Sequence, residues 1–333
     1  MNIVGIDISK ARFDAALLVG ERVRHAAFSN TEAGFGQLLA WLARQSPDPA
    51  APIHACMEAT GNWGLDLAAF LHGQGVRISV VNPARIKAYG NSELARNKTD
   101  RLDAALIARF YRAQVPPAWV PPAPDLRQLR ELVRRCDALK AARVQELNRQ
   151  KSGFASAAVA ASISAHVAWL DAQIEAIMDA VRGLVAADPV LSKNLALVRT
   201  ITGFGEVSAT ILLAELPNVE PRGSPDIADF TPKALAAFAG LSPSEHSSGS
   251  SVRRPGKISR VGNERLRSTL YMCALSAART NKALLGFVQR LKHAGKPPKV
   301  ILVAVARKLL IYAHAVVRTQ TPFTSSPNAP CPA

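Results

Sequence analysis

The stretch NIVGIDISKARFDAALLVGERVRHAAFS, residues 2–29, decides the fold of the N-terminal part of the chain. Its first two segments, 2–9 and 12–19, are apolar runs with a short break between them, which is typical of strands joined by a tight turn. Residues 22–29 alternate between polar and apolar side chains and predict a third strand. Asp7 interrupts the first run, and a carboxylate in mid-strand is costly to bury unless something such as a metal ion compensates it.

Helical and strand-like patterns alternate after these three strands. In chain order they predict a helix over 32–45 capped by Thr31, a strand over 52–59, a helix ending near His72, a strand over 76–82 ended by Pro83, and a helix from Thr99 or Asp100 to Ala113. Hairpin strands followed by α/β units predict a mixed sheet with helices on its faces.

The proline-rich segment VPPAWVPPAP (115–124) predicts an extended linker after this α/β domain. Two long helical patterns with thin apolar stripes follow, and they predict a helical hairpin or coiled coil that can serve as a dimer contact. Later helices, interrupted by glycines, are expected near 190–200, 205–216, 232–239, 262–281, 283–294 and 297–318. The predicted domains are therefore an α/β domain at 1–124, a helical segment at 125–187, a mainly helical domain at 188–323 and a disordered tail at 324–333.

Positive charge is concentrated in one block of the chain. The formal net charge is +16, and residues 246–320 contain 15 Lys and Arg but a single acid, Glu264. Such a block is the electrostatic footprint of a protein that binds a phosphate backbone. The alternative is a solvated basic surface that only keeps the protein soluble.

Features of other protein classes are missing from the sequence. No uninterrupted apolar run reaches the ~20 residues of a membrane-spanning helix, and the N-terminus does not resemble a signal peptide. The four cysteines are far apart and form no CxxC pair, which argues against a metal cluster or a disulfide framework. These features predict a cytoplasmic protein without a membrane partner.

Four carboxylates are candidates for a metal site. Asp7 lies in a strand, and Glu58 ends another strand, where ligand sites of α/β sheets gather. Asp100 and Asp103 open a helix, and their spacing puts them on one face. Such oxygen ligands suit Mg²⁺, which can support phosphoryl transfer. Alternatively, Asp100 caps its helix, Asp103 complements the helix dipole and Glu58 caps the next helix; Asp14 is expected at an exposed strand position.

Two glycine- and serine-rich segments of the C-terminal part are candidates for contact with DNA. Gly203 and Gly205 flank a turn that resembles a helix-hairpin-helix, whose free N–H groups can meet a phosphate, although an ordinary αα-turn is the alternative. A Ser/Gly loop offers a nucleophile among Ser244, Ser247, Ser248, Ser250 and Ser251, and residue types alone select none of them. The cations that follow this loop would stabilise a phosphoryl group, and they are Arg253, Arg254, Lys257, Arg260, Arg265 and Arg267. The alternative is that the loop is only a flexible linker.

Together the motifs GIDISK, EATG, NPARIKAY, RNKTDRLDA, ITGFGEVSA, FAGLSP, SSGSSVRRPGKISRVGN and LRSTLYMCAL resemble the DEDD-type insertion-sequence transposases, the Piv-related or "IS one-ten" group that includes bridge-RNA-guided recombinases. The resemblance covers about residues 2–323. It implies a RuvC-like, RNase H-like domain that binds Mg²⁺ through Asp7, Glu58, Asp100 and Asp103, a coiled-coil segment, and a helical transposase domain with a nucleophilic serine that matches Ser248.

In that family, the serine becomes covalently linked to a 5′-phosphate of DNA, the two catalytic domains meet across a dimer, four subunits assemble on DNA, and a structured guide RNA can specify target and donor. The residues Ser244-Glu245-His246 depart from the family pattern, and Ser247 adjoins Ser248, so the nucleophile is less firmly placed than the four acids. The alternatives are a RuvC-like nuclease without a serine nucleophile, a nucleic-acid-binding protein with a decayed site, and an actin-like ATPase. The last is disfavoured because a second phosphate loop is missing.

Overall fold

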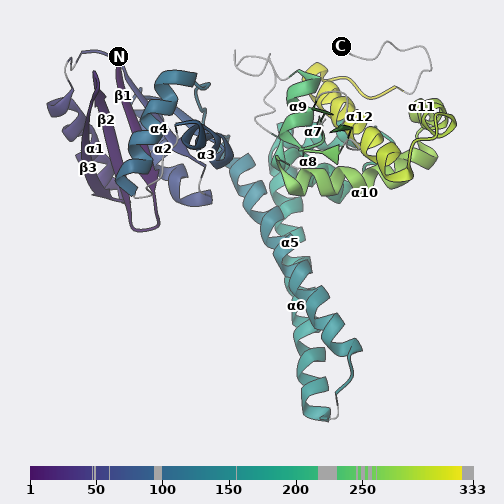
Figure 1. Ribbon diagram of the computed structural model, residues 1–333. Helices are drawn as coiled ribbons and strands as arrows, with labels where there is room; N and C mark the ends of the chain where they lie inside the picture. The colour runs from purple at the N-terminus through teal and green to yellow at the C-terminus, as the bar shows by residue number, and fades with distance from the viewer. Residues whose placement is uncertain are drawn as a thin grey trace. The chain divides into compact units, whose positions relative to one another are not determined.

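The computed structural model describes residues 1–46, 48, 50–59, 61–93, 100–154, 156–216, 231–244, 247–248, 252–253, 257–259 and 261–324. For residues 62, 100–102, 244, 247–248, 252–253 and 257 it describes the backbone alone. The chain divides into two compact units, Met1–Pro121 and Pro122–Ala333 (Figure 1). The predicted disordered tail lies outside the described residues from 325 onward.

A five-stranded mixed sheet forms the centre of the first unit. Its strands are β1 (Asn2–Ile8), β2 (Arg12–Val19), β3 (Arg22–Ser29), β4 (Ile53–Glu58) and β5 (Arg77–Val81), in the spatial order β3-β2-β1-β4-β5. The first three strands pair antiparallel, whereas β4 is parallel to both β1 and β5. The predicted mixed α/β sheet is therefore confirmed.

Helices cover both faces of this sheet. Helices α1 (Glu32–Gln45) and α2 (Leu65–Gly73) bury one apolar stripe each against Ile6, Ile8 and Met57. Helices α3 (Pro83–Ser92) and α4 (Asp100–Gln114) lie on the opposite face, where Ile107 and Tyr111 of α4 are fully buried. Because both faces are covered, a residue's parity along each central strand determines which helical layer it contacts.

Helix α3 was missed in the prediction, which ended the strand at Pro83 and placed no helix between Pro83 and residue 99. Asn82 caps this helix, since its side-chain oxygen accepts a hydrogen bond from the Ala84 N–H at 2.8 Å. Pro83 occupies the first turn, where the missing N–H costs nothing and the fixed φ suits a helix. A proline after a strand can thus start the next helix as well as end the strand.

The second unit begins with two long helices that pack along each other in opposite directions. Helices α5 (Pro124–Lys151) and α6 (Ala157–Ala187) form this helical hairpin (Figure 1). Cross-contacts pair Arg143 with Asp171 and Glu146 with His166, as an antiparallel register requires. Leu129 and Val133 pack with Val181 and Val185 near the base of the hairpin.

The other helices of the second unit enclose one apolar core. They are α7 (Pro189–Arg199), α8 (Glu206–Glu215), α9 (Pro232–Phe238), α10 (Glu264–Thr280), α11 (Lys282–His293) and α12 (Pro298–Thr319). Helix α12 is long and apolar enough to cross a membrane by length and composition alone, but 56% of its most apolar window is buried in the protein. Leu309, Leu310 and Ala313 are fully buried there, so α12 serves as a core helix.

In the Ser/Gly segment between α9 and α10, where the sequence analysis placed a loop, the described residues include short β-ladders. Strand β6 (Pro243–Ser244) pairs with β9 (Lys257–Ile258), and β7 (Ser247–Ser248) pairs with β8 (Val252–Arg253). We refer to the segment 243–258 as the serine arm. The prediction overlooked these ladders because two-residue strands leave no periodicity in the sequence.

Candidate active site

Asp7 and Glu58 lie on the same face of the sheet, towards α3 and α4. Ile6 and Ile8 belong to the core under α1 and α2, so Asp7 between them faces the other way. Met57 belongs to that same core, which turns the following Glu58 to the Asp7 side. Because Ile6 pairs with Met57 in the parallel register, Asp7 and Glu58 are neighbours one residue further on, about 5 Å apart between strands.

Helix α4 brings its first turn to the Asp7 end of this face. A Cβ on Gly5 would overlap the backbone of Ala104 and Ala108, so the helix crosses β1 directly over this glycine. The other end of α4 lies over the start of the neighbouring strand, where the Tyr111 hydroxyl is hydrogen-bonded to Nδ1 of His54. Helix α4 therefore runs antiparallel to β1, with its N-terminus towards Asp7.

Asp103 reaches the level of Asp7 as a result. Asp7 lies about 7 Å beyond Gly5 along the strand, and Asp103 lies about 4 to 5 Å from the crossing point along the helix axis. Asp103 is half-buried and shares a helical face with Ile107, whereas Asp100 is described only by its backbone at the first position of α4. The partial positive charge of the helix N-terminus offsets the gathered carboxylates.

Asp14 is a further acid at this place, and the prediction of an exposed position was wrong. Its residue is only 9% exposed, and it pairs directly with Asp7 across the antiparallel β1–β2 ladder. Phe13 and Ala15 belong to the core under α1 and α2, so Asp14 shares the face of Asp7. Arg12 lies 3.9 Å away and partly balances its charge. The central position of β2, buried on both faces, was the signal that sequence reasoning did not use.

The donor set of this face is chemically suited to a hard divalent cation. Carboxylate oxygens are the ligands that Mg²⁺ prefers. Among the side chains that the structure describes, which do not include that of Asp100, no three Asp, Glu, His or Cys groups lie together as a ready cluster for an ion. The described carboxylates Asp7, Glu58 and Asp103 each have an interaction partner, so binding a cation involves rearranging these contacts.

The serine arm rises from a fixed base. The Ser259 N–H donates to the Ser242 carbonyl at 2.9 Å, and the Asn263 N–H donates to the Phe238 carbonyl at 2.7 Å. Gly262 has a φ of 145°, and a Cβ there would meet the Phe238 carbonyl, so this position requires glycine. The two ends of the arm are therefore joined to each other, and the chain that follows the arm is held at the end of α9.

Along the arm, the backbone register places Ser248 opposite Val252, and Ser247 opposite Arg253. Arg253 and Lys257 are described by their backbones on β8 and β9. The predicted contacts Arg254 and Arg260, with Ser250 and Ser251, lie outside the described residues. The register brings the predicted nucleophile and the first predicted cation to the same short ladder.

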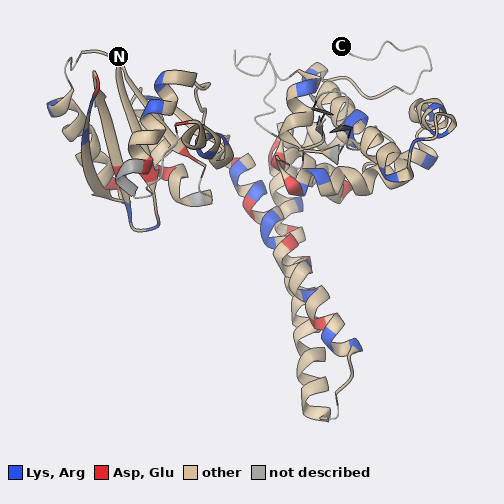
Figure 2. Cartoon of the chain, viewed as in Figure 1, with Lys and Arg blue, Asp and Glu red and all other residues tan. Residues whose placement is uncertain are grey.

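Two of the predicted phosphate contacts have partners within the protein. Arg265 is ion-paired with Asp137, and its Nε lies 3.4 Å from Glu215. The guanidinium of Arg267 donates a hydrogen bond to the Ala239 carbonyl at 3.3 Å. Lys and Arg recur along α10, α11 and α12 (Figure 2), yet the charge of Arg265 is already balanced by two carboxylates.

Glu215 is the centre of this charge network, and the sequence analysis did not single it out. Its residue is 3% exposed, and Arg134 donates to both of its oxygens at 3.0 and 3.1 Å. The Asn263 amide, whose oxygen caps α10, donates to Glu215 at 2.8 Å. Burial alone would raise the pKa of Glu215, but the hydrogen bonds from Arg134 and Asn263 and the nearby positive charges outweigh burial and lower it.

One glycine of the predicted helix-hairpin-helix turn, Gly203, has a structural explanation, whereas a Cβ on Gly205 would meet nothing within 4 Å. Gly203 has a φ of 121°, and a Cβ there would lie 2.7 Å from that of Ala277 in α10. The Gly205 N–H at the start of α8 donates to the Ser208 hydroxyl at 2.9 Å. A groove beside this turn is lined by Glu206, Glu264 and other residues. Phosphate binding at this turn remains a prediction.

Comparison with known proteins places these features in context. A family model described as "Transposase", of the DEDD type, matches residues 4–155, and the model "Transposase IS116/IS110/IS902 family" matches residues 195–289. The pilin gene-inverting proteins of Moraxella bovis and Moraxella lacunata are each 31% identical over 322 residues, which cover 96% of this chain and 97% of theirs. The putative transposase y4pF/y4sB of Sinorhizobium fredii is 37% identical over 149 residues, 42% of this chain and 34% of its own length.

Proposed function

Because the chain belongs to the IS116/IS110/IS902 family of transposases and is thus a DNA transposase or recombinase, we propose that it mobilises its own insertion sequence through a covalent serine–DNA intermediate. The observation that carries the proposal is the convergence of Asp7, Glu58 and the first turn of α4 on one face of the sheet. The names of the Moraxella relatives favour strand exchange over simple strand cutting.

In this proposal the first unit is an RNase H-like domain that binds Mg²⁺ through Asp7, Glu58, Asp100 and Asp103. The strand order β3-β2-β1-β4-β5, with β2 antiparallel to its neighbours, supports this fold. When bound, Mg²⁺ stabilises the charge that develops on the attacking and leaving oxygens of a phosphodiester. The carboxylates hold and orient the ions, and the α4 N-terminus limits the repulsion among the carboxylates.

Ser248 is the proposed nucleophile. Its hydroxyl gives up a proton while its Oγ attacks the phosphorus, and the 3′-oxygen of the broken strand leaves, so that a 5′-phosphoserine forms. Arg253, Arg254, Lys257 and Arg260 would balance the charge of the transferring phosphoryl group. The position of Arg253 on the strand opposite Ser247 supports this division of roles.

The assembly is also part of the proposal. We place the protein in the cytoplasm, where it binds the element ends, the target DNA and a structured guide RNA. The hairpin of α5 and α6 would act as the family's coiled-coil segment in a dimer, and four subunits would assemble on DNA. The concentration of positive charge in 246–320 supports a nucleic-acid partner.

The decisive experiment looks for the covalent intermediate. The full-length protein is incubated with Mg²⁺ and labelled DNA carrying the element ends, and the products are denatured before electrophoresis. We expect a slow, protease-sensitive band that Ser248→Ala lacks, although this variant still binds the DNA. Strands cut to free 5′-phosphates without any adduct would instead identify a RuvC-like nuclease that uses water.

A further inference from the structure

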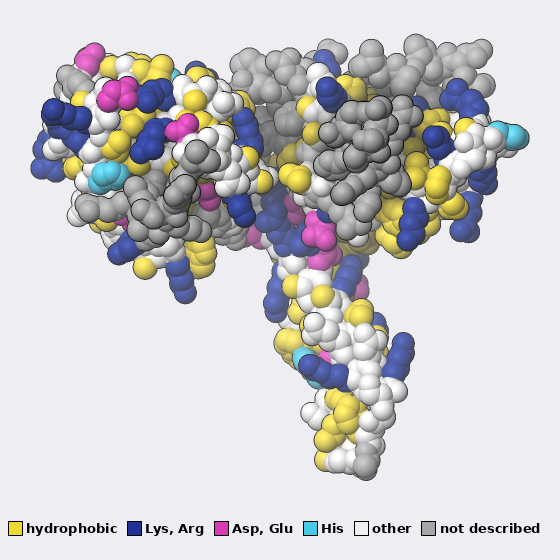
Figure 3. All heavy atoms as spheres, in the orientation of Figure 1, with side chains coloured by type: hydrophobic (Ala, Val, Ile, Leu, Met, Phe, Trp, Pro, Cys, Tyr) yellow, Lys and Arg dark blue, Asp and Glu magenta, His cyan; other side chains and the backbone are white. Residues whose placement is uncertain are grey.

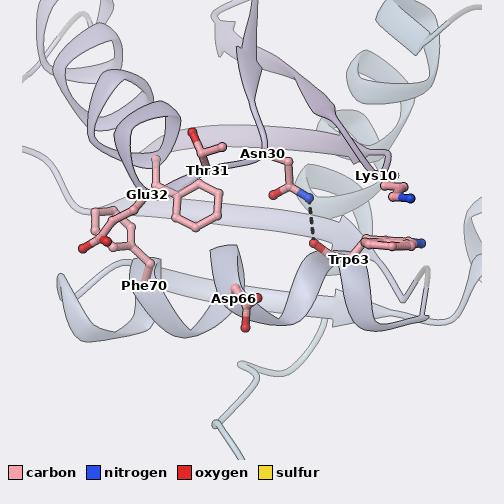
Figure 4. A pocket seen from close by; sticks show the side chains of 8 residues that line it. Lys10, Asn30, Thr31, Glu32, Trp63, Asp66 and Phe70 are labelled. Atoms are coloured by element: carbon pink, nitrogen blue, oxygen red, sulfur yellow. Dashed lines mark hydrogen bonds between the residues drawn. The ribbon is translucent and has the colours of Figure 1, made fainter.

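A groove opens at the end of the sheet where β1 and β4 finish. It has a volume of about 480 Å³ and lies between the N-terminal turn of α1 and the segment formed by the 3-10 turn Gly61–Gly64 and α2 (Figure 4). The turn after β1 and the chain after β4, which follow Asp7 and Glu58, contribute its rim. The groove therefore lies at the same end of the sheet as Asp7 and Glu58 and within the same unit, but on the side that α1 and α2 cover.

Trp63 gives the groove an exposed aromatic surface. The indole residue is 49% exposed, and Nζ of Lys10 lies 5.5 Å from its ring centroid. Phe35 and Phe70, with ring centroids 5.5 Å apart, also line the groove. A large aromatic side chain that stays exposed beside a cation is the arrangement on which unpaired bases stack in single-strand-binding proteins.

The position of Trp63 is fixed by the backbone around it. The Asn30 side-chain amide donates hydrogen bonds to the carbonyls of Ser9 and Trp63, each at 3.1 Å (Figure 4). Asn30 thereby joins the β1–β2 turn, which contains Lys10, to the 3-10 turn, which contains Trp63. A site held in this way loses little conformational entropy when a ligand binds.

The two ends of the groove differ in charge. Figure 4 shows Lys10 beside Trp63 at one end and Glu32 with Phe70 at the other, while Asp66 lies between them. The carboxylates repel phosphates but accept hydrogen bonds from the exocyclic amines of cytosine, adenine or guanine. A nucleotide fits this polarity when its phosphate lies at Lys10 and the amine edge of its base points towards the acids.

We propose that this groove binds one unpaired DNA base next to the phosphate on which the acidic face acts, an inference that rests on the proposed function. Lys10 follows Asp7 by three residues, a span of at most about 10 Å. Stacked nucleotides rise about 3.4 Å each, so a strand of a few nucleotides can pass from the acidic face around the end of the sheet to the groove. Trp63 stacks on the base, and Glu32 and Asp66 select bases that carry an amine over thymine.

The test follows tryptophan fluorescence as single-stranded DNA hexamers are added to the full-length protein in EDTA, so that no strand is cut. We expect quenching in the wild type and its loss in Trp63→Phe. The matched control is Trp169→Phe, because Trp169 in α6 is 50% exposed but lies beside His166, outside the groove. In a separate measurement, the fluorescence anisotropy of labelled hexamers reports their binding. The affinity of Trp63→Ala for these hexamers should be about 5- to 100-fold lower than that of the wild type.

Titrations with other oligonucleotides identify the class of ligand. Hexamers of dC should quench more than hexamers of dT, and Glu32→Gln should narrow that difference. Equal quenching in the wild type and Trp63→Phe would refute the proposal, as would quenching by fully paired duplex. Quenching by RNA hexamers but not by DNA would assign the groove to the guide strand and also contradict it.

Failure of the groove and failure of the proposed function give different results. Glu58→Gln should retain the Trp63 quenching although it forms no covalent adduct. If the groove proposal is wrong, Trp63→Ala recombines and binds hexamers as the wild type does. If the proposed function is wrong, the wild type forms no adduct with Mg²⁺, whatever the fluorescence shows.

Discussion

The acidic face of the first unit and the basic block of the second unit use charge in different ways. In the first unit, Asp7, Asp14 and Glu58 share one face of the sheet near the first turn of α4, and each of them has an interaction partner within the protein. In the second unit, Arg265 lies against Asp137 and Glu215, so part of the positive charge is used within the fold. The comparison teaches that charged residues in a sequence must be weighed together with the partners that the fold gives them.

Removal of the proposed nucleophile should have the largest effect. Ser248→Ala is expected to reduce recombination by about 10⁴-fold or more, since no other group can form the covalent link. Ser247→Ala, one residue earlier on the same strand, is the matched control and should retain most of the activity. Recombination is measured with a donor and target plasmid assay, and the opposite ranking of the two variants would move the nucleophile to Ser247.

Neutralising one acid of the catalytic face should have the next largest effect. Asp7→Asn is expected to lower strand cleavage by roughly 10²- to 10³-fold, comparable to the loss of one strong electrostatic contact in other active sites. With Mg²⁺ the variant should gain less in melting temperature than the wild type does.

Asp14→Asn separates a ligand from a bystander at the same site. If Asp14 only supports the charge of Asp7, cleavage should fall by no more than about 10-fold, which is 1.4 kcal/mol. The same pair of melting curves, with and without Mg²⁺, checks this. A loss as large as that of Asp7→Asn would show that the fifth carboxylate is required directly.

Two arginines test the contrast between a charge that is ion-paired within the fold and a charge that is proposed to contact DNA. Arg265→Ala should lower the free energy of unfolding by about 3 kcal/mol, because it leaves Asp137 and the buried Glu215 with one partner fewer. It should leave the salt dependence of DNA binding unchanged. Arg253→Ala should do the reverse and reduce the slope of log K against log salt by about 1. Denaturant titrations and binding at several salt concentrations measure both.

The smallest effect concerns pH. Because its folded-state pKa is lowered, ionised Glu215 stabilises the second unit above the ordinary carboxylate pKa, and this contribution disappears as pH falls through the lower folded-state value. Melting temperatures between pH 6 and pH 3 should therefore fall more steeply in the wild type than in Glu215→Gln. Glu175→Gln, which removes an exposed partner of Arg182, should leave the pH curve of the wild type intact.

Much of the fold could be predicted because its signals are local. The alternation in residues 2–29 determines three strands, and the helical periods of 125–151 and 156–187 give both hairpin helices within a residue or two. Features that depend on distant partners could not be predicted in this way. Asp14 is buried because β2 is central, and Arg265 is paired because α5 passes close to it.

In the candidate site, too, the features with a local sequence signal could be predicted, and those that depend on distant residues could not. Spacing in the sequence was enough to nominate Asp7, Glu58 and Asp103. Strand parity puts Asp7 and Glu58 on one face of the sheet, and the helix crossing at Gly5 directs the start of α4 towards the Asp7 end of that face. Residue types alone could not choose a serine in the arm, and the short ladders that orient its backbone have no sequence period. Trp63 attracted no attention in the sequence, because a single tryptophan carries no pattern until its exposure is known.

The carboxylate of Glu215 also has a mechanical meaning. One of its oxygens receives Arg134 from the hairpin, and the other is shared with Asn263, the residue at which the chain re-enters the bundle after the serine arm. Glu215 therefore connects the hairpin to the chain that follows the serine arm. A tilt of the hairpin at its base would either break the hydrogen bonds between Arg134 and the buried Glu215 or move Asn263 together with Glu215.

At the tip of the hairpin, residues 152–170 carry no Lys, Arg, Asp or Glu, and hydrophobic side chains lie on its surface (Figure 3). A force on this tip would therefore act through Arg134 and Glu215 on Asn263, which follows the serine arm in the chain.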